Sequence, residues 1–228
     1  MFIAFIVYFA PYVWRNNNFC ALLFLYIKYK IMVKGNNRCM KNFEFSIFNS
    51  FCSNGIESSL KNILPSEKPI IVCIGSDLVI GDCLAPLVGS FLVKKNVPCY
   101  VYGTLSEPIT AKEVNHVGKT LKKLHPKSKI IAIDAALGNY DDIGQVKVYE
   151  KGLYPGLGVN KKLSIIGDVS ILGVVCDKSY KNNNLFNLTR LNLVLKMAEI
   201  ISEGVVNYLN CINESDNYFT YKQVEKLA

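Results

Sequence analysis

The chain has 228 residues, half of them hydrophobic, and a formal net charge of +8. This length and hydrophobic share suffice for one well-buried core, so we predict a single folded domain. The charge does not indicate a nucleic-acid-binding protein, because no stripe of arginines alternates with aromatic residues. Residues 1–39 also hold five basic and no acidic residues, which leaves only about +3 on the rest of the chain.

The eight cysteines show no CxxC pair, and the chain has only two histidines. A zinc-finger pattern therefore cannot be written. Cys73 and Cys99 lie within or beside short apolar runs, as is typical of reduced, buried cysteines in a cytosolic protein. We expect a cytoplasmic protein with no specific nucleic-acid partner.

Residues 1–39 form an apolar and basic extension. Its two apolar runs, 1–14 and 19–27, are both shorter than the roughly 18 residues needed for a membrane span. Neither run has the pattern of a signal peptide. A weak membrane anchor, a disordered leader and a wrongly assigned start codon remain as interpretations. The abundance of residues with AT-rich codons favours a start at Met40, with Met32 as another candidate, and we expect no membrane contact unless the extension is real.

A lead-in over residues 40–68 precedes a regular alternation of strands and helices. We predict a strand over 70–74, and then a helix over 83–95 with Pro86 harmlessly in its first turn. A second strand over 99–102 follows. The next helix begins with a capping box at Thr110 and Glu113 and ends before His125 and Pro126.

The second half of the chain continues the alternation. We predict a buried strand over 130–133 that ends at Asp134, a half-exposed strand over 145–149 and a more buried one over 169–175. A long amphipathic helix covers about 189–209, and 211–228 form a tail. Residues 69–210 therefore predict one α/β domain, a doubly wound, mixed but mostly parallel sheet with helices on both faces.

Two aspartates, Asp82 and Asp134, each follow a predicted parallel strand. In an open parallel sheet the carboxyl ends of neighbouring strands meet where the strand order reverses, and ligands bind there. If the two carboxyls meet, either one keeps a proton for acid/base chemistry or a divalent metal ion lies between them. Asp82 as a helix N-cap and Asp134 as a strand-end cap are the structural alternatives.

Other residues are weaker candidates. Glu107 follows the second strand and is predicted to line the same cleft, whereas Asp168 precedes a strand, which favours a structural role. The glycine-rich segment 152–158 with its two following lysines suits a substrate-facing rim, and we select Gly156, Gly158 and Lys161 as substrate-binding candidates. Cys83 near a helix N-terminus is a candidate for a lowered thiol pKa.

Several motifs in order make the chain similar to the YyaC family of sporulation proteins. They lie at 73–77, 81–89, 101–105, 133–138, 155–163, 167–173 and 189–191. That family resembles hydrogenase maturation endopeptidases and the germination protease in fold. The chain departs from the family pattern at Cys83 and Ala85, which leaves both aspartates in place, and over 176–188, which bears on substrate contacts.

The resemblance implies a peptidase-like site in which Asp82 and Asp134 activate water or hold a metal ion. The maturation enzymes add a histidine that has no counterpart here, whereas the germination protease relies on acidic residues alone. The resemblance therefore implies a peptidase of sporulating cells that works without a cofactor and acts on a peptide or on small acid-soluble spore proteins. A non-catalytic scaffold and a metal-binding maturation factor are the competing functions.

Overall fold

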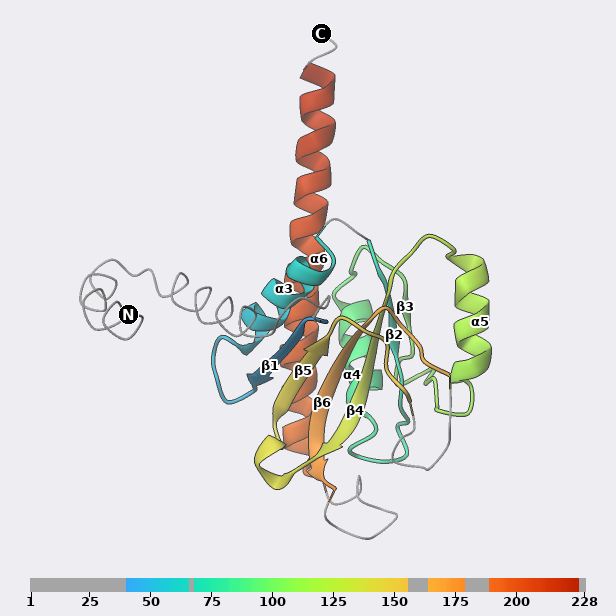
Figure 1. Ribbon diagram of the computed structural model, residues 1–228, viewed down its shortest axis with the longest axis vertical. Helices are drawn as coiled ribbons and strands as arrows, with labels where there is room; N and C mark the ends of the chain where they lie inside the picture. Colours follow the sequence, from blue (N-terminus) through green and yellow to red (C-terminus); the bar gives the residue numbers. More distant parts are fainter. Residues whose placement is uncertain (1–39, 66–67, 156–163, 179–188, 226–228) are drawn as a thin grey trace, which may run out of the picture. The chain divides into compact units, whose positions relative to one another are not determined.

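A computed structural model describes residues 40–65, 68–155, 164–178 and 189–225 of the chain, with side chains up to residue 213 (Figure 1). The chain divides into two compact units, Met1–Lys41 and Asn42–Ala228. The second unit holds all the helices and strands considered below. Among the described helices, none combines the length and the apolar composition required to span a bilayer.

The second unit is built on one sheet whose strand order is β1-β5-β6-β4-β2-β3 (Figure 1). The strands are β1 (Asn42–Ser46), β2 (Ile70–Cys73), β3 (Val101–Tyr102), β4 (Ile130–Gly138), β5 (Gln145–Tyr149) and β6 (Val169–Asp177). The four strands β3, β2, β4 and β6 are parallel, whereas β5 and β1 add to β6 as antiparallel strands. The chain leaves β2 for β3 on one side and returns to β4 on the other side. The predicted doubly wound, mostly parallel sheet is confirmed.

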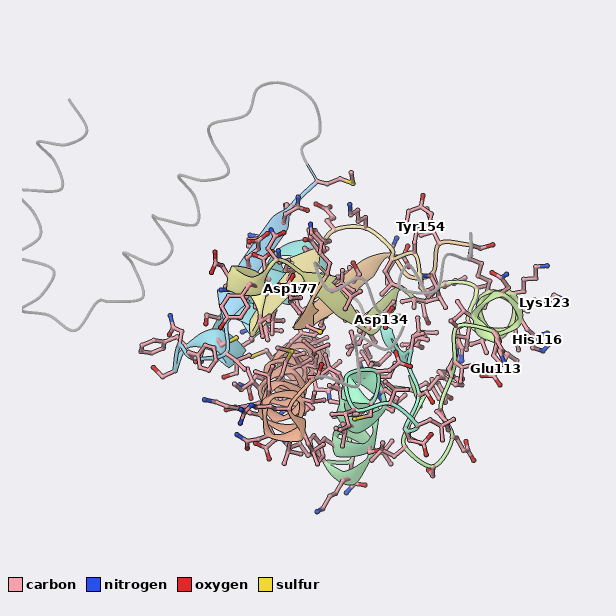
Figure 2. All side chains as sticks on the ribbon, turned by 90° about the horizontal axis from the view of Figure 1, so that it is seen from below. Glu113, His116, Lys123, Asp134, Tyr154 and Asp177 are labelled. Atoms are coloured by element: carbon pink, nitrogen blue, oxygen red, sulfur yellow. The ribbon has the colours of Figure 1, made fainter. Side chains whose placement is uncertain are left out.

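Helices cover both faces of this sheet. They are α3 (Cys52–Ile63), α4 (Leu84–Lys94), α5 (Val114–Leu124) and α6 (Leu191–Glu225), with a short 3₁₀ helix η1 (Tyr140–Asp142) after β4. Helices α3, α4 and α6 pack together on one face, and α5 lies alone on the other (Figures 1 and 2). Gly173 of β6 gives room to the side chains of Leu84 and Met197 on the first face.

Side chains alternate between two apolar layers along the central strands, as the period of a strand requires. Ile70, Val72 and Ala132 pack with Leu121 of α5. The intervening residues point to the opposite face and are fully buried, and they include Ile71, Cys73, Ile131 and Ile133. The fold therefore holds β2 and β4 rigidly side by side.

The lead-in over 40–68 is part of the fold, which the sequence pattern did not reveal. β1 pairs with β5 at the edge of the sheet, and α3 packs against α6. The Tyr208 hydroxyl of α6 donates a 2.9 Å hydrogen bond to the Leu64 carbonyl after α3. This contact connects segments that are far apart in the sequence.

Three predicted boundaries were wrong. Helix α6 runs to Glu225 rather than 209, since no glycine or proline interrupts residues 210–225. Helix α5 begins at Val114, because the Thr110 hydroxyl donates to the Glu113 carboxylate instead of accepting a backbone N–H. β4 continues beyond Asp134 to Gly138, because β6 pairs with it along that whole stretch.

Candidate functional site

Asp82 lies in the loop that connects β2 to α4, and this loop folds back on itself at Gly75. The Gly75 N–H donates to the Ile109 carbonyl at 2.9 Å, and the Ser76 N–H donates to the Asp82 carbonyl at 3.3 Å. A Cβ at position 75 would lie 2.1 Å from the Asp82 carbonyl oxygen. Glycine is therefore required for the close approach that sets Asp82 over the end of β2.

Asp82 does not cap α4. The N-cap position of α4 is Cys83, and no side chain makes a capping hydrogen bond there. Pro86 lies in the first turn, where its missing N–H costs nothing. The Asp82 carboxyl therefore has no role in starting the helix, and the helix-cap interpretation is wrong.

Asp134 lies inside β4 rather than at its end. It stands opposite Leu172 of β6, while on the other side the pairing with β2 stops one residue earlier, at Cys73 and Ile133. Its side chain is only 8% exposed. Its Oδ1 accepts a 2.8 Å hydrogen bond from the N–H of Ala135, its own neighbour. The carboxyl thus sits one residue beyond the point where the pairing of β4 with β2 stops.

An electrostatic interaction connects the two aspartates, since the charge of Asp82 acts on the Asp134 carboxyl. Burial raises the pKa of the Asp82 carboxyl to about 6, and the nearby Ser76 N–H opposes this rise. The pKa of the Asp134 carboxyl is raised well above its ordinary value, first by burial and then by the charge of Asp82. Two carboxyls that repel each other in a low-dielectric site titrate apart, so one ionises while the other keeps its proton.

The described residues hold no cluster of three histidine, cysteine, aspartate or glutamate side chains that would bind a metal ion. Two carboxylates alone do not complete the four-ligand set of a structural zinc site, whereas Mg²⁺, which keeps several waters, is commonly held by one or two. Cys83, directly after Asp82, does not supply a thiolate. Burial and the charge of Asp82 raise its thiol pKa, which overturns the prediction of a lowered pKa.

The other acidic residues and the predicted rim residues lie in different parts of the chain. Asp77 is exposed in the same loop as Asp82. Asp168 is structural, as predicted, since its Oδ2 accepts the Ile130 N–H at 3.0 Å at the start of β4. Glu107 is exposed and lines a separate hollow beside β3, which neither aspartate lines. The predicted rim residues Gly156, Gly158 and Lys161 lie outside the described residues.

That hollow contains two residues that the sequence reasoning did not select for a site, Glu113 at the N-cap position of α5 and His116 within α5. Figure 2 shows both at α5, away from Asp134 in the sheet. The available signal was their helical spacing, because Glu113, His116 and Thr120 recur on one face of a helix. Sequence alone could not show that this face borders β3.

Comparisons with known proteins agree with the sequence motifs. A family model described as "Protein of unknown function (DUF1256)" matches residues 41–204, a range that includes both aspartates. The "Uncharacterized protein YyaC" of Bacillus subtilis (strain 168) is 39% identical over 152 residues, which are 66% of this chain and 73% of that protein. A NiFe hydrogenase maturation protease, HycI from Thermococcus kodakarensis KOD1, aligns over 67% of this chain and 99% of its own, at 19% identity and a TM-score of 0.45. By the family match and the extent of its identity to YyaC, the chain belongs to the YyaC family, which carries the DUF1256 domain.

Proposed function

We propose that this chain is a peptidase that hydrolyses an amide bond of a peptide or protein with Asp82 and Asp134. The observation that carries the proposal is the pair itself. Two carboxyls interact at the reversal point of the strand order, and both have raised pKa values. Perturbed carboxyls that lie together at such a point are typical of acid/base sites.

The different burial of the two groups assigns their roles. With a pKa of about 6, Asp82 is largely ionised at neutral pH and acts as the general base. It takes a proton from water as the water oxygen attacks the substrate carbonyl carbon. Asp134 keeps its proton on Oδ2, because Oδ1 accepts the Ala135 N–H. That proton hydrogen-bonds to the carbonyl oxygen, and Asp82 then passes its own proton to the leaving amine.

The proposed hydrolysis uses the two carboxyls without a metal ion. Support comes from the donor set, since the described residues group no third histidine, cysteine, aspartate or glutamate side chain with the two carboxyls. Calorimetry with nickel, zinc or magnesium tests the point. Stoichiometric binding that Asp82→Asn abolishes would favour the metal-binding maturation factor instead.

We further propose that the substrate is a protein of the spore and that the enzyme acts in the cytoplasm of the spore-forming cell or forespore. Its support is the similarity of the chain's motifs to the YyaC family of sporulation proteins. Small acid-soluble spore proteins are the first substrates to test.

The decisive experiment compares Asp82→Asn and Asp134→Asn with Asp77→Asn as the matched control. Asp77 is exposed in the same loop, so its replacement makes the same chemical change outside the site. We expect cleavage of small acid-soluble spore proteins by the parent and by Asp77→Asn, and a loss of at least about 100-fold in each of the other two. Undiminished cleavage by folded Asp82→Asn and Asp134→Asn would overturn the assignment of the site to these two aspartates. No cleavage of any spore protein by the parent would overturn the peptidase proposal and favour a non-catalytic scaffold.

A further inference from the structure

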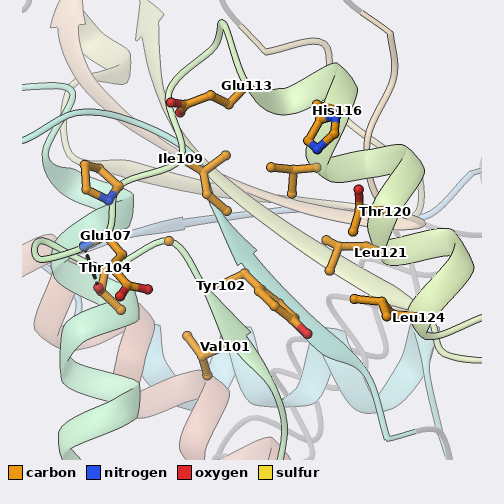
Figure 3. A pocket seen from close by; sticks show the side chains of 13 residues that line it. Val101, Tyr102, Thr104, Glu107, Ile109, Glu113, His116, Thr120, Leu121 and Leu124 are labelled. Atoms are coloured by element: carbon orange, nitrogen blue, oxygen red, sulfur yellow. Dashed lines mark hydrogen bonds between the residues drawn. The ribbon is translucent and has the colours of Figure 1, made fainter.

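A hollow of about 430 Å³ opens between β3, the segment after it and α5 (Figure 3). This volume is within the range of about 300–1,000 Å³ found for ligand sites. Val101, Tyr102 and Ile109 line one side, and Leu121 and Leu124 line the other. The hollow does not belong to the aspartate site, and the function proposed above makes no use of it.

The walls of the hollow are largely apolar, and its polar lining combines two carboxylates with His116, two threonines and the Tyr102 side chain. Glu107 and Glu113 both line it, and among the described residues no lysine or arginine does. Glu113 is held in place by the Thr110 N–H at 2.8 Å, and Glu107 is exposed at the opposite side. Lysines of α5, including Lys119, Lys122 and Lys123, lie exposed on the helix and do not line the hollow. An elongated ligand with an apolar stem and a positive end fits this arrangement.

The hollow borders the aspartate site through one residue. Ile109 lines the hollow, and its carbonyl accepts the Gly75 N–H at 2.9 Å. Gly75 in turn lies against the backbone of Asp82. A chain bound at the two aspartates therefore has to extend by only a few residues to place a side chain in the hollow.

We propose that this hollow holds a lysine or arginine side chain of the peptide that is cleaved at Asp82 and Asp134. The aliphatic stem packs against Val101 and Leu121, and the cationic head lies between Glu107 and Glu113. The inference rests on the proposed peptidase function for the identity of the ligand as a peptide. It adds a preference for basic residues near the cleaved bond.

The test measures binding separately from cleavage, with the full chain carrying Asp134→Asn so that the peptide is not consumed. Three fluorescein-labelled hexapeptides of alanine and leucine differ only in one central residue, which is arginine, methionine or glutamate. By fluorescence anisotropy we expect the arginine peptide to bind most tightly and the glutamate peptide most weakly. Glu107→Gln and Glu113→Gln should each weaken the binding of the arginine peptide about 2- to 5-fold, because these charges are partly exposed. Neither should change the binding of the methionine peptide.

A second variant tests the hollow itself. Thr120→Phe fills the hollow from α5 and should weaken the binding of the arginine peptide at least about 10-fold. Lys119→Phe places the same ring on the exposed side of the helix and should leave that binding unchanged. Equal binding of the three peptides, absence of binding, or indifference to Thr120→Phe would overturn the inference. Selective binding by a protein that never cleaves any peptide would refute the peptidase proposal and leave the basic-residue pocket standing.

Discussion

Replacing Asp82 by asparagine should stabilise the folded chain at neutral pH while it removes activity. The rise of the Asp82 pKa from 3.8 to about 6 means that the folded state holds this proton more tightly than the unfolded state. Stability therefore falls as pH rises between these two values, and the penalty is complete above about 6 and absent below 3.8. At 1.36 kcal/mol per pKa unit the penalty is at most about 3 kcal/mol. Because the carboxyl is partly exposed, we expect a gain of about 1–2 kcal/mol from the substitution.

Urea unfolding followed by circular dichroism at about pH 4 and about pH 7 measures this gain. Asp82→Asn should match the parent at the lower pH and exceed it at the higher one. Part of the gain comes from Asp134, whose pKa falls when the neighbouring charge is removed. Exposed Asp77→Asn should change stability at neither pH. An equal gain at both pH values would mean that the amide simply packs better, and no gain at about pH 7 would mean that Asp82 is not strained by burial; either result refutes the reasoning.

Three further predictions follow from the site and its frame. The rate of peptide cleavage should rise with pH through about 6 as Asp82 ionises and fall again at higher pH as Asp134 loses its proton; an optimum near pH 4 in a pH–rate profile would contradict the assigned roles. Gly75→Ala should lower activity more than about 10-fold, because its Cβ would collide with the Asp82 carbonyl, and retained activity with an unchanged circular dichroism spectrum would show that the loop tolerates the shift. Asp168→Ala should cost about 2 kcal/mol in urea unfolding by leaving the Ile130 N–H without its acceptor, yet cleavage should be unaffected; lost cleavage at full stability would place Asp168 in the site.

The central sheet could be predicted because its strands are short apolar runs bounded by turn residues. β2, β4 and β6 are largely buried on both faces, so each is predominantly apolar and easily recognised. The strand order then makes β2 and β4 parallel neighbours, so that the loop holding Asp82 begins at the strand next to the one that holds Asp134. The end of β4 could not be predicted, since pairing with β6, a contact distant in sequence, extends it past Asp134.

β1 and α3 were missed for a related reason. The helix carries its buried residues Cys52, Ile56 and Leu60 at helical spacing, but serine, asparagine and glycine, which are weak helix formers, lie between them. Its stability depends on packing against α6, and Gly55 is needed where the helix meets the ring of Phe45. Tertiary contacts of this kind are not visible in a local pattern. The same holds for the hollow beside β3, whose two walls come from separate segments.

The position of Asp134 differs from that of a capping carboxyl. A capping aspartate stabilises a fold because it accepts hydrogen bonds that would otherwise be lost. The hydrogen bond that Asp134 accepts comes from the N–H of Ala135, the next residue in its own strand. In return the fold buries an ionisable group beside Asp82, inside a strand whose preceding residues are all apolar. An apolar residue there would cost less, and the chemical role proposed above gives a reason for a carboxyl at this position.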